Sequence, residues 1–245
     1  MISSANNATI RRTRRLRKRA ERVKRRAFLV EGHRAVRVAV ETDSGVELLL
    51  HTPAAAKRHR QLIIDAEDAG TRVLEVTPHI MATLTAAATT PDVVAVVRIP
   101  LPAAAASGPT LIMAGVRDPA TVGALLSTAA SAGMTRAVAV KGTADIYSSA
   151  PVRIGAGAHF LIGLLQSPSL EDCLATAKAE RVVRLGTQGP PPWSVDLSGS
   201  IALIVDDDDD ADGDVAVPGE AGARAPLAIR AAVTMFEARR QREAG

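Results

Sequence analysis

The sequence predicts an α/β protein of two domains, and two observations carry this prediction. Short apolar runs alternate with stretches of helical periodicity along most of the chain, which is typical of α/β folds. The alternation stops at residues 101–110, LPAAAASGPT, a charge-poor segment rich in Pro and Ala that is typical of a linker. The 245 residues suffice for two domains of roughly 100 residues each. We therefore expect domains at residues 11–100 and 111–245.

The first half begins with a polar stretch, residues 1–10, that we expect to be a disordered tail. A basic segment follows it, and then the alternation starts. Strands are expected at residues 27–30, 46–51, 72–76 and 92–99, and helices at 33–41 and 53–69. A further short helix is expected after Thr77 and Pro78, which are suited to an N-cap and a first helical turn.

The second half is predicted to hold a parallel sheet covered by helices. Strands are expected at residues 111–115, 136–141, 161–165, 182–185 and 201–205. Several of these are continuous apolar runs, as strands buried on both faces require. Helices are expected at residues 121–133, 169–179 and 227–242. Ser169 is the expected N-cap of the second, because Glu171 and Asp172 follow in the first turn, where the helix dipole favours acids.

Composition excludes several classes of protein. A hydrophobic fraction of 47% supports real cores, and an aromatic fraction of 2% means that Ala, Val, Leu and Ile must fill them. The single cysteine, Cys173, excludes an internal disulfide and is expected to be a small buried apolar side chain. No apolar run approaches the roughly 20 residues that span a bilayer, and no apolar signal core follows the N-terminal charges. We therefore expect a cytoplasmic protein without a membrane partner.

The charge is distributed unevenly. Residues 1–40 hold thirteen Arg and Lys side chains against two acidic ones, a net charge of +11, so the other residues carry −7 of the total of +4. A basic segment on an acidic body indicates a polyanionic partner, and we expect RNA, bound through phosphates. A flexible basic tail or a solvated helix face is the alternative. The expected RNA contacts in this segment are Arg11, Arg12, Arg14, Arg15, Arg17, Lys18, Arg19, Arg22, Lys24, Arg25 and Arg26.

An ordered series of motifs resembles one enzyme family. Residues 115–129, GVRDPATVGALLSTA, resemble the first motif of the SpoU/TrmH family, Asp-Pro-Gly-Asn-x-Gly-Ala-x-x-Arg-Thr-Ala. Residues 145–160, DIYSSAPVRIGAGAHF, resemble its Arg-x-Ser-x-Gly-Ala-x-Phe stretch. LGTQG at 185–189, VDL at 195–197, IALIV at 201–205 and FEARR at 236–240 follow in the family order. FLVEG at 28–32 and TPDVVAVV at 90–97 resemble the start and end of the family's substrate-binding domain.

This resemblance implies both a fold and an activity. The members are SPOUT-class RNA ribose 2′-O-methyltransferases, with a small ribosomal-protein-like α/β domain that grips RNA. A domain with a trefoil knot around S-adenosylmethionine follows, and two copies form a homodimer through this C-terminal domain. The resemblance implies rRNA or a ribosomal particle as partner and makes Arg153 a second RNA contact, with a structural salt bridge as its alternative. It places the cofactor against Gly186, Thr187, Val205, Val217 and Leu227.

The polar positions of the family motifs are replaced. Thr121 stands for the family's Asn, and Ser127 for its Arg, so the permanent cation is missing. The loop Gly-Asn/Ser-Glu-x-x-Gly becomes an acidic run with Asp208 in place of its polar residues. Arg224 and Pro226 stand for the Ser and Asn of the last motif, and proline has neither a side-chain amide nor a backbone N–H.

These replacements predict an RNA-binding protein with eroded methyl-donor motifs and weak or absent catalysis, for which no catalytic residue is assigned. Two alternatives stay open. An active methyltransferase remains possible if Arg117 or Arg153 supplies the missing cation. The chain is otherwise a non-catalytic dimer partner of an active relative.

No metal site is predicted. The histidines His33, His51, His59, His79 and His159 show no metal-ligand spacing along the sequence. The acidic run opens like a calcium loop, Asp208-x-Asp210-x-Asp212-Gly213, but its required Glu falls one place late. A solvated acidic loop is therefore the preferred interpretation.

Overall fold

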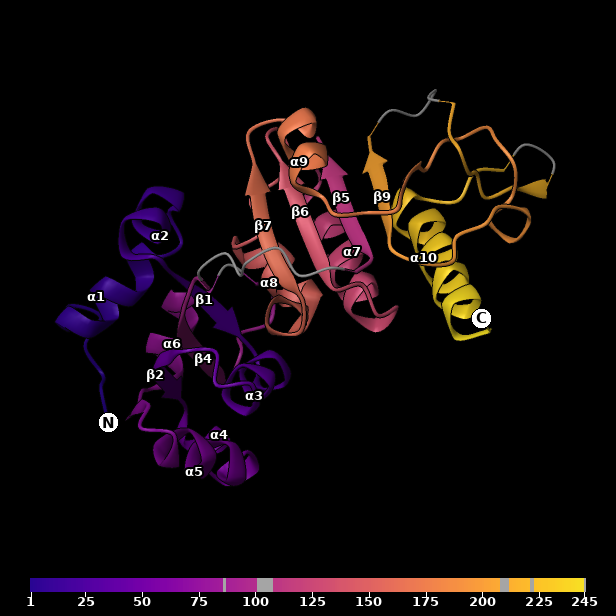
Figure 1. The fold of residues 1–245 in the computed structure, drawn as a ribbon. Coiled ribbons are helices and arrows are strands. Elements are labelled where there is room, and N and C mark those ends of the chain that lie inside the picture. The colour runs from indigo at the N-terminus through magenta and orange to yellow at the C-terminus, as the bar shows by residue number, and fades with distance from the viewer. Residues whose placement is uncertain (86, 101–107, 208–211, 221–222, 245) are drawn as a thin grey trace. The chain divides into compact units, whose positions relative to one another are not determined.

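The computed structural model describes residues 1–85, 87–100, 108–207, 212–220 and 223–244 (Figure 1). The chain forms two compact units. The N-terminal unit comprises Met1–Leu101 and Tyr147–Phe160, and the C-terminal unit comprises Pro102–Ile146 and Leu161–Gly245. Most of the predicted linker, residues 101–107, lies outside the described residues.

A four-stranded mixed sheet with the order β1-β4-β2-β3 forms the core of the N-terminal unit. Its strands are β1 (Ala27–Glu31), β2 (Val46–His51), β3 (Arg72–Glu75) and β4 (Val93–Arg98). β4 runs antiparallel to β1 and β2, whereas β2 and β3 are parallel. Glu31 pairs with Val94 and His51 with Val93, so the ends of β1 and β2 meet the start of β4 at one edge.

Four helices of this unit follow its strands closely in sequence. They are α3 (His33–Glu41), α4 (Pro53–Arg58), α5 (Arg60–Asp68) and α6 (Pro78–Leu84). The single helix predicted at residues 53–69 is two helices, because His59 has the non-helical angles φ −120° and ψ 36°. The predicted start of α6 is confirmed, since the Ile80 amide donates to Thr77 Oγ1 at 3.4 Å.

The N-terminal segment is ordered, so the predicted disordered tail at residues 1–10 is wrong. It forms α1 (Ala8–Arg15), followed by α2 (Arg19–Arg25). Asn7 caps α1 by accepting from the amides of Thr9 and Ile10. Ile10 and Leu16 are buried in the core of the unit, and Ile2 forms a bridge with Val76. These apolar side chains hold the basic segment against the unit.

The prediction that residues 147–160 belong to the second domain is also wrong. These residues form α8 (Ser149–Gly155) and the 3-10 turn η1 (Ala158–Phe160), and they pack within the N-terminal unit. The Phe28 ring lies 5.0 Å from the Tyr147 ring and 6.0 Å from the Phe160 ring. Ser149 also donates to Glu31 at 2.8 Å. Side chains far apart in sequence therefore decide where this segment lies.

The C-terminal unit is built on a five-stranded parallel sheet, which confirms the parallel sheet predicted for this half and the α/β character of the chain. The strands, in the spatial order β7-β6-β5-β9-β8, are β5 (Thr110–Ala114), β6 (Arg136–Val140), β7 (Gly163–Ser167), β8 (Arg181–Arg184) and β9 (Ile201–Asp206). The helices are α7 (Pro119–Ser131), α9 (Leu170–Thr176) and α10 (Leu227–Ala244), with the 3-10 turn η2 (Pro192–Ser194).

These helices pack on the sheet and on one another. α7 contacts α10, and α9 contacts β6 and β7. The predicted cap of α9 is confirmed by the Asp172 amide, which donates to Ser169 Oγ at 3.0 Å. Across the part of the chain that the structure describes, no helix combines the length and apolarity needed to cross a membrane.

Candidate RNA-binding surface and donor-binding loops

The basic segment forms a helical surface on the N-terminal unit. The segment from α1 to the C-cap of α2 carries nine exposed cations and the half-buried Arg25, and the buried Ile10, Thr13 and Leu16 hold it in place. We call these ten side chains the basic surface: Arg11, Arg12, Arg14, Arg15, Arg17, Lys18, Arg19, Lys24, Arg25 and Arg26. Because the helices are anchored, their cations occupy defined positions instead of those of a flexible tail.

Arg22 does not belong to this surface, and its position in the structure does not support the predicted RNA contact. Its side chain is buried, and its guanidinium donates to the carbonyls of Leu16 and Arg17, each at 2.9 Å. These two carbonyls lie between α1 and α2, where helical hydrogen bonds end. Arg22 therefore fixes the angle between the helices that present the other cations.

Arg153 lies in the last turn of α8 and is exposed. It belongs to the N-terminal unit, and both α2 and α8 contact β1. Among the residues that the structure describes, Arg153 has no ion-pair partner, so the alternative of a structural salt bridge has no support.

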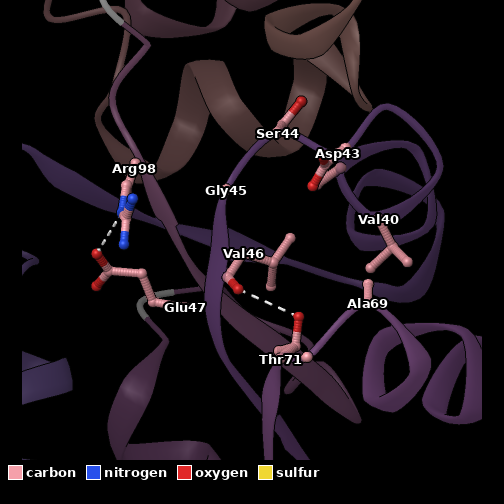
Figure 2. Close-up of a pocket in the computed structure, with 11 residues that line it drawn as sticks. Val40, Asp43, Ser44, Gly45, Val46, Glu47, Ala69, Thr71 and Arg98 are labelled. Carbon is pink, nitrogen blue, oxygen red and sulfur yellow. Dashed lines mark hydrogen bonds and ion pairs between the residues drawn. The ribbon is translucent and has the colours of Figure 1, made fainter.

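A polar cavity of about 380 Å³ lies at the turn between α3 and β2 (Figure 2). Glu47 and Arg98 pair across it at 2.9 Å, and Thr71 Oγ1 donates to the Val46 carbonyl at 3.1 Å. Asp43 and Ser44 complete its rim. Figure 2 shows these two interactions on the wall of the cavity, and we assign the cavity no catalytic role.

The loop before α7 carries the first family-like motif. Asp118 caps α7 by accepting from the Ala120 amide at 3.2 Å, the Thr121 amide at 2.8 Å and the Thr121 hydroxyl at 2.7 Å. The hydrogen bond from the Thr121 hydroxyl, with those from the two amides, lowers the pKa of Asp118. Ser127 is half-buried two turns further along α7. Thr121 thus serves the helix cap, and neither Thr121 nor Ser127 supplies a cation.

The acidic run after β9 pairs with groups of its own unit. Asp207 accepts from the Arg117 amide at 2.7 Å. Asp206 pairs with the Arg184 guanidinium at 3.1 Å, and Asp214 accepts from the Arg184 amide at 2.8 Å. Asp208 and Asp210, and with them most of the calcium-loop pattern, lie outside the described residues.

The loops after β8 and β9 carry the backbone groups expected to hold a methyl donor. They run side by side, with bridges between Leu185 and Val215 and between Gln188 and Asp212. The buried Gly186 donates its amide to the Val215 carbonyl at 2.9 Å. Gly213 lies so close to the Gly186 backbone that a side chain at position 213 would overlap it. The two loops are therefore joined through their own backbones.

Arg230 of α10 contacts the same loops. It is 3% exposed, and its guanidinium donates to the Gly186 carbonyl at 2.8 Å and to the Ala225 carbonyl at 3.1 Å. Both backbone polar groups of Gly186 are thus bonded within the chain. Sequence reasoning missed Arg230, although a lone cation inside the apolar run LAIRAAV was a signal that could have identified it.

The other expected donor contacts surround these loops. Val205 is buried in β9, and Thr187, Val217 and Leu227 are half-buried. Arg224 and Pro226 are exposed, and the Pro226 carbonyl accepts from the amides of Ile229 and Arg230 at the start of α10. Pro226 therefore ends the loop and begins the helix without offering a side-chain hydrogen bond.

Comparison with known proteins decides the family. Residues 7–95 match the MRM3-like substrate binding domain. The chain is 30% identical over 209 residues to the 23S rRNA (guanosine(2553)-2′-O)-methyltransferase RlmP of Bacillus subtilis, covering 83% of this chain and 81% of that protein. The chain belongs to the SpoU/TrmH family of SPOUT RNA methyltransferases.

Two solved methyltransferase structures share the fold over 98% of this chain. The AdoMet-bound rRNA methyltransferase of Sinorhizobium meliloti has a TM-score of 0.80 at 23% identity, with 97% of its chain covered. The SpoU methyltransferase AviRb of Streptomyces viridochromogenes, in complex with AdoMet, has a TM-score of 0.81 at 22% identity, with its whole chain, 100%, covered. The match to the MRM3-like substrate binding domain begins at residue 7, the residue that caps α1, so the basic surface lies within it.

Proposed function

We propose that this SpoU/TrmH protein binds rRNA through the basic surface and transfers methyl groups weakly or not at all. The observation that carries the second part is the buried Arg230 guanidinium on the Gly186 carbonyl. The first part is supported by the exposed cations of α1 and α2, because phosphate attracts Arg and Lys regardless of base sequence. It is also supported by RlmP, whose name gives 23S rRNA as its substrate.

S-adenosylmethionine fits the donor loops of this chain poorly. The donor carries a cationic sulfonium, whereas Arg230 places a permanent buried cation on one of the backbone groups expected to contact it. The carbonyl that would accept from a ligand already accepts from Arg230, so a bound donor would have to break that hydrogen bond.

We further infer a homodimer formed by the C-terminal unit. Three large apolar side chains of α10 and η2 are exposed, Trp193 by 59%, Ile229 by 54% and Phe236 by 45%, and α10 contacts η2. Exposed apolar groups on adjoining elements favour a protein interface. A trefoil knot in this unit is part of the same proposal. Family membership supports it, as does the return of the chain after β9 along residues 185–188.

The alternative is an active 2′-O-methyltransferase, which is favoured by the enzyme names of RlmP and of an RlmB from Xanthomonas axonopodis that is 32% identical over 154 residues. Arg117 or Arg153 would then have to act beside the ribose. The amide of Arg117 is bound by Asp207, which leaves its side chain as the group available for that role. A non-catalytic partner of an active relative would instead co-purify with that relative.

Calorimetric titration of the full chain with S-adenosylmethionine and S-adenosylhomocysteine tests the donor half of the proposal. We expect no binding below millimolar concentration, and we expect Arg230→Met to gain at least about 10-fold in affinity, because it frees the Gly186 carbonyl. Arg242→Met is the matched control, since Arg242 lies in the same helix and donates to the Ala132 carbonyl instead. Micromolar binding by the unaltered chain, together with transfer of labelled methyl groups to rRNA, would place the active enzyme first.

A further inference from the structure

Three elements of the N-terminal unit bring potential metal ligands to one edge of its sheet. His33 directly follows β1 and Gly32, Asp92 directly precedes β4, and His59 lies between α4 and α5. The backbone around them is tied across this edge. The Gly32 amide donates to the Val93 carbonyl at 2.9 Å, and the Thr52 amide donates to the Asp92 carbonyl at 3.0 Å. The three side chains therefore start from fixed positions.

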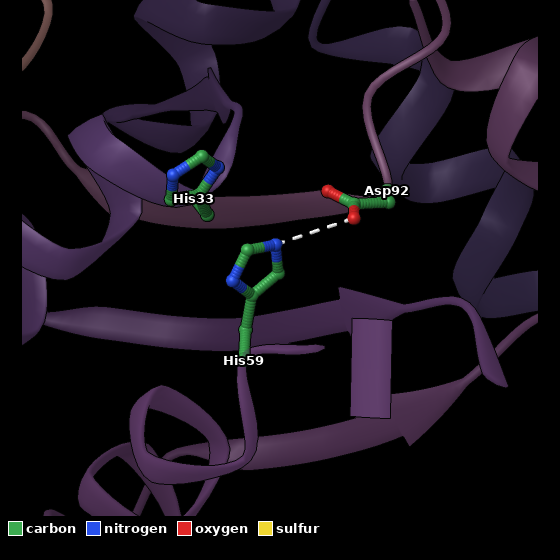
Figure 3. A group of neighbouring side chains, drawn as sticks. All are labelled: His33, His59 and Asp92. Atoms are coloured by element: carbon green, nitrogen blue, oxygen red, sulfur yellow. Dashed lines mark ion pairs between the residues drawn. The ribbon is translucent and has the colours of Figure 1, made fainter. Parts of the chain in front are cut away.

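The side chains point toward one another (Figure 3). One ligand atom from each of His33, His59 and Asp92 lies within 4.8 Å of the others. The two imidazole rings stack with their centroids 4.3 Å apart and their planes 13° apart. His59 Nε2 lies 3.3 Å from Asp92 Oδ2. Two ligands bound tetrahedrally to zinc at about 2.0–2.1 Å would be separated by about 3.3 Å.

His59 Nε2 provides a second, independent observation that points to a ligand at this position. His59 is 9% exposed, and its Nε2 is a buried nitrogen without a hydrogen-bond partner. The nearby Asp92 carboxylate is close enough for a hydrogen bond, but its alignment with the ring nitrogen does not form one. Buried polar atoms without a partner are rare in folded proteins. A metal ion between the two groups would satisfy both.

We propose that His33, His59 and Asp92 bind a divalent transition-metal ion, with zinc as the best match. Two imidazoles and one carboxylate are among the ligand sets that zinc uses, with water in the fourth position. The His33 ring would have to rotate about its side-chain bonds to bring its ligand atom from within 4.8 Å to about 3.3 Å of the other two. The ion would fasten the ends of β1 and α4 to the start of β4, so its first effect is on stability.

Charged groups around the site affect the pKa of His33 and compete for the Asp92 carboxylate. Burial lowers the pKa of His33, with further contributions from His59, Arg34 and Arg37, while Asp92 opposes the shift. Arg58 competes, because its guanidinium lies 3.1 Å from Asp92 Oδ2. The Arg58 side chain is 68% exposed, however, and such an exposed ion pair is weak enough to give way to a metal ion.

Zinc titration of the full, untagged chain after treatment with a chelator tests the proposal. We expect one zinc ion per chain with micromolar affinity, and a rise in the melting temperature of roughly 5–10 °C at a hundredfold excess over Kd. Cobalt(II) alone provides the spectroscopic probe, since a tetrahedral site gives intense visible absorption bands. His33→Ala, His59→Ala and Asp92→Ala should each lower zinc affinity at least about 10-fold, as loss of a ligand requires.

Matched variants separate a metal site from general damage. His79→Ala removes an exposed histidine of α6 and should leave zinc binding unchanged, whereas Arg58→Ala should tighten it by removing the competitor. Circular dichroism establishes that each variant is folded. The proposal is overturned if the unaltered chain binds no zinc, if cobalt(II) gives only octahedral spectra, or if His79→Ala weakens binding as much as His59→Ala. None of these outcomes depends on donor or RNA binding, so they leave the proposed function untouched.

Discussion

The two units of this protein differ in where their arginine side chains lie. In the N-terminal unit, the buried Arg22 donates to backbone carbonyls between α1 and α2, whereas the remaining cations of that segment lie at the surface. In the C-terminal unit, Arg230 is buried in the loops where the family resemblance places the methyl donor. The same side-chain type therefore forms an exposed basic surface in one unit and is buried among loops in the other. The fold fixes the position of a possible binding site, and individual side chains determine whether a ligand can occupy it.

The largest expected effect concerns RNA. Arg14→Gln, Arg15→Gln and Arg17→Gln together should weaken rRNA binding by about 10–100-fold and reduce the salt dependence of log K by about 2–3, since each neutralised phosphate contact contributes close to one. Filter binding at several salt concentrations measures both. The control is Lys57→Gln, Arg60→Gln and Lys141→Gln, which removes the same charge from exposed positions outside the basic surface. Equal losses in the two triple variants would mean that only net charge matters.

A smaller effect, on stability, distinguishes Arg22 from its exposed neighbours. Arg22→Met should lower the free energy of unfolding by about 2 kcal/mol, because two backbone carbonyls between α1 and α2 lose their charged donor. Arg14→Met should change it by less than about 0.5 kcal/mol, as expected for an exposed site. Urea denaturation gives both values. If the two variants were equally stable, the buried role of Arg22 would have to be abandoned.

A third prediction concerns the stability of the C-terminal unit, to which the ionised carboxylate of Glu237 contributes. Arg240 and Gln241 donate to its carboxylate and lower its pKa to about 2 from 4.5. The ionised form is stabilised in the folded protein, so its contribution is complete above about pH 4.5 and is lost as the pH falls toward 2.

Glu237→Gln should therefore reduce stability by at most about 1 kcal/mol at pH 7, because Arg240 is largely exposed, and the difference should shrink as the pH falls below 4.5. Thermal unfolding of both proteins between pH 7 and pH 2.5 provides the measurement. Gln241→Glu is not a suitable control, since Gln241 also binds the Leu197 amide and the Val195 carbonyl. A deficit that persists unchanged at pH 2.5 would contradict the role of the ionised carboxylate.

The smallest expected effect is the slow reaction of the Cys173 thiol with a thiol reagent. The thiol is 3% exposed, and burial raises its pKa, so a thiol reagent should react with the folded protein at pH 7.5 far more slowly than with the denatured chain. Cys173 is the single cysteine and lies in the C-terminal unit. Its labelling rate in increasing urea, compared with RNA binding, shows whether the two units unfold together. Rapid labelling in the absence of urea would mean that the face of α9 carrying the thiol does not pack against the sheet.

Most of the secondary structure followed from local sequence. The strands of both sheets were predicted from apolar runs, and the caps at Thr77 and Ser169 from residue types that accept backbone hydrogen bonds. The family motifs also located the loops around Gly186. These features depend on residues close together in the chain, which a linear pattern records.

Tertiary structure decided which polar groups meet. The sequence alone determined that the chain is an α/β protein with a basic N-terminal segment and altered donor motifs. It did not reveal that Ile10 and Leu16 anchor that segment, that Arg22 is buried, or that Arg230 reaches Gly186. His33, His59 and Asp92 show no metal-ligand spacing, and they meet because strand pairing brings the ends of β1 and β2 to the start of β4. Contacts of this kind depend on sheet register and packing, which sequence separation does not encode.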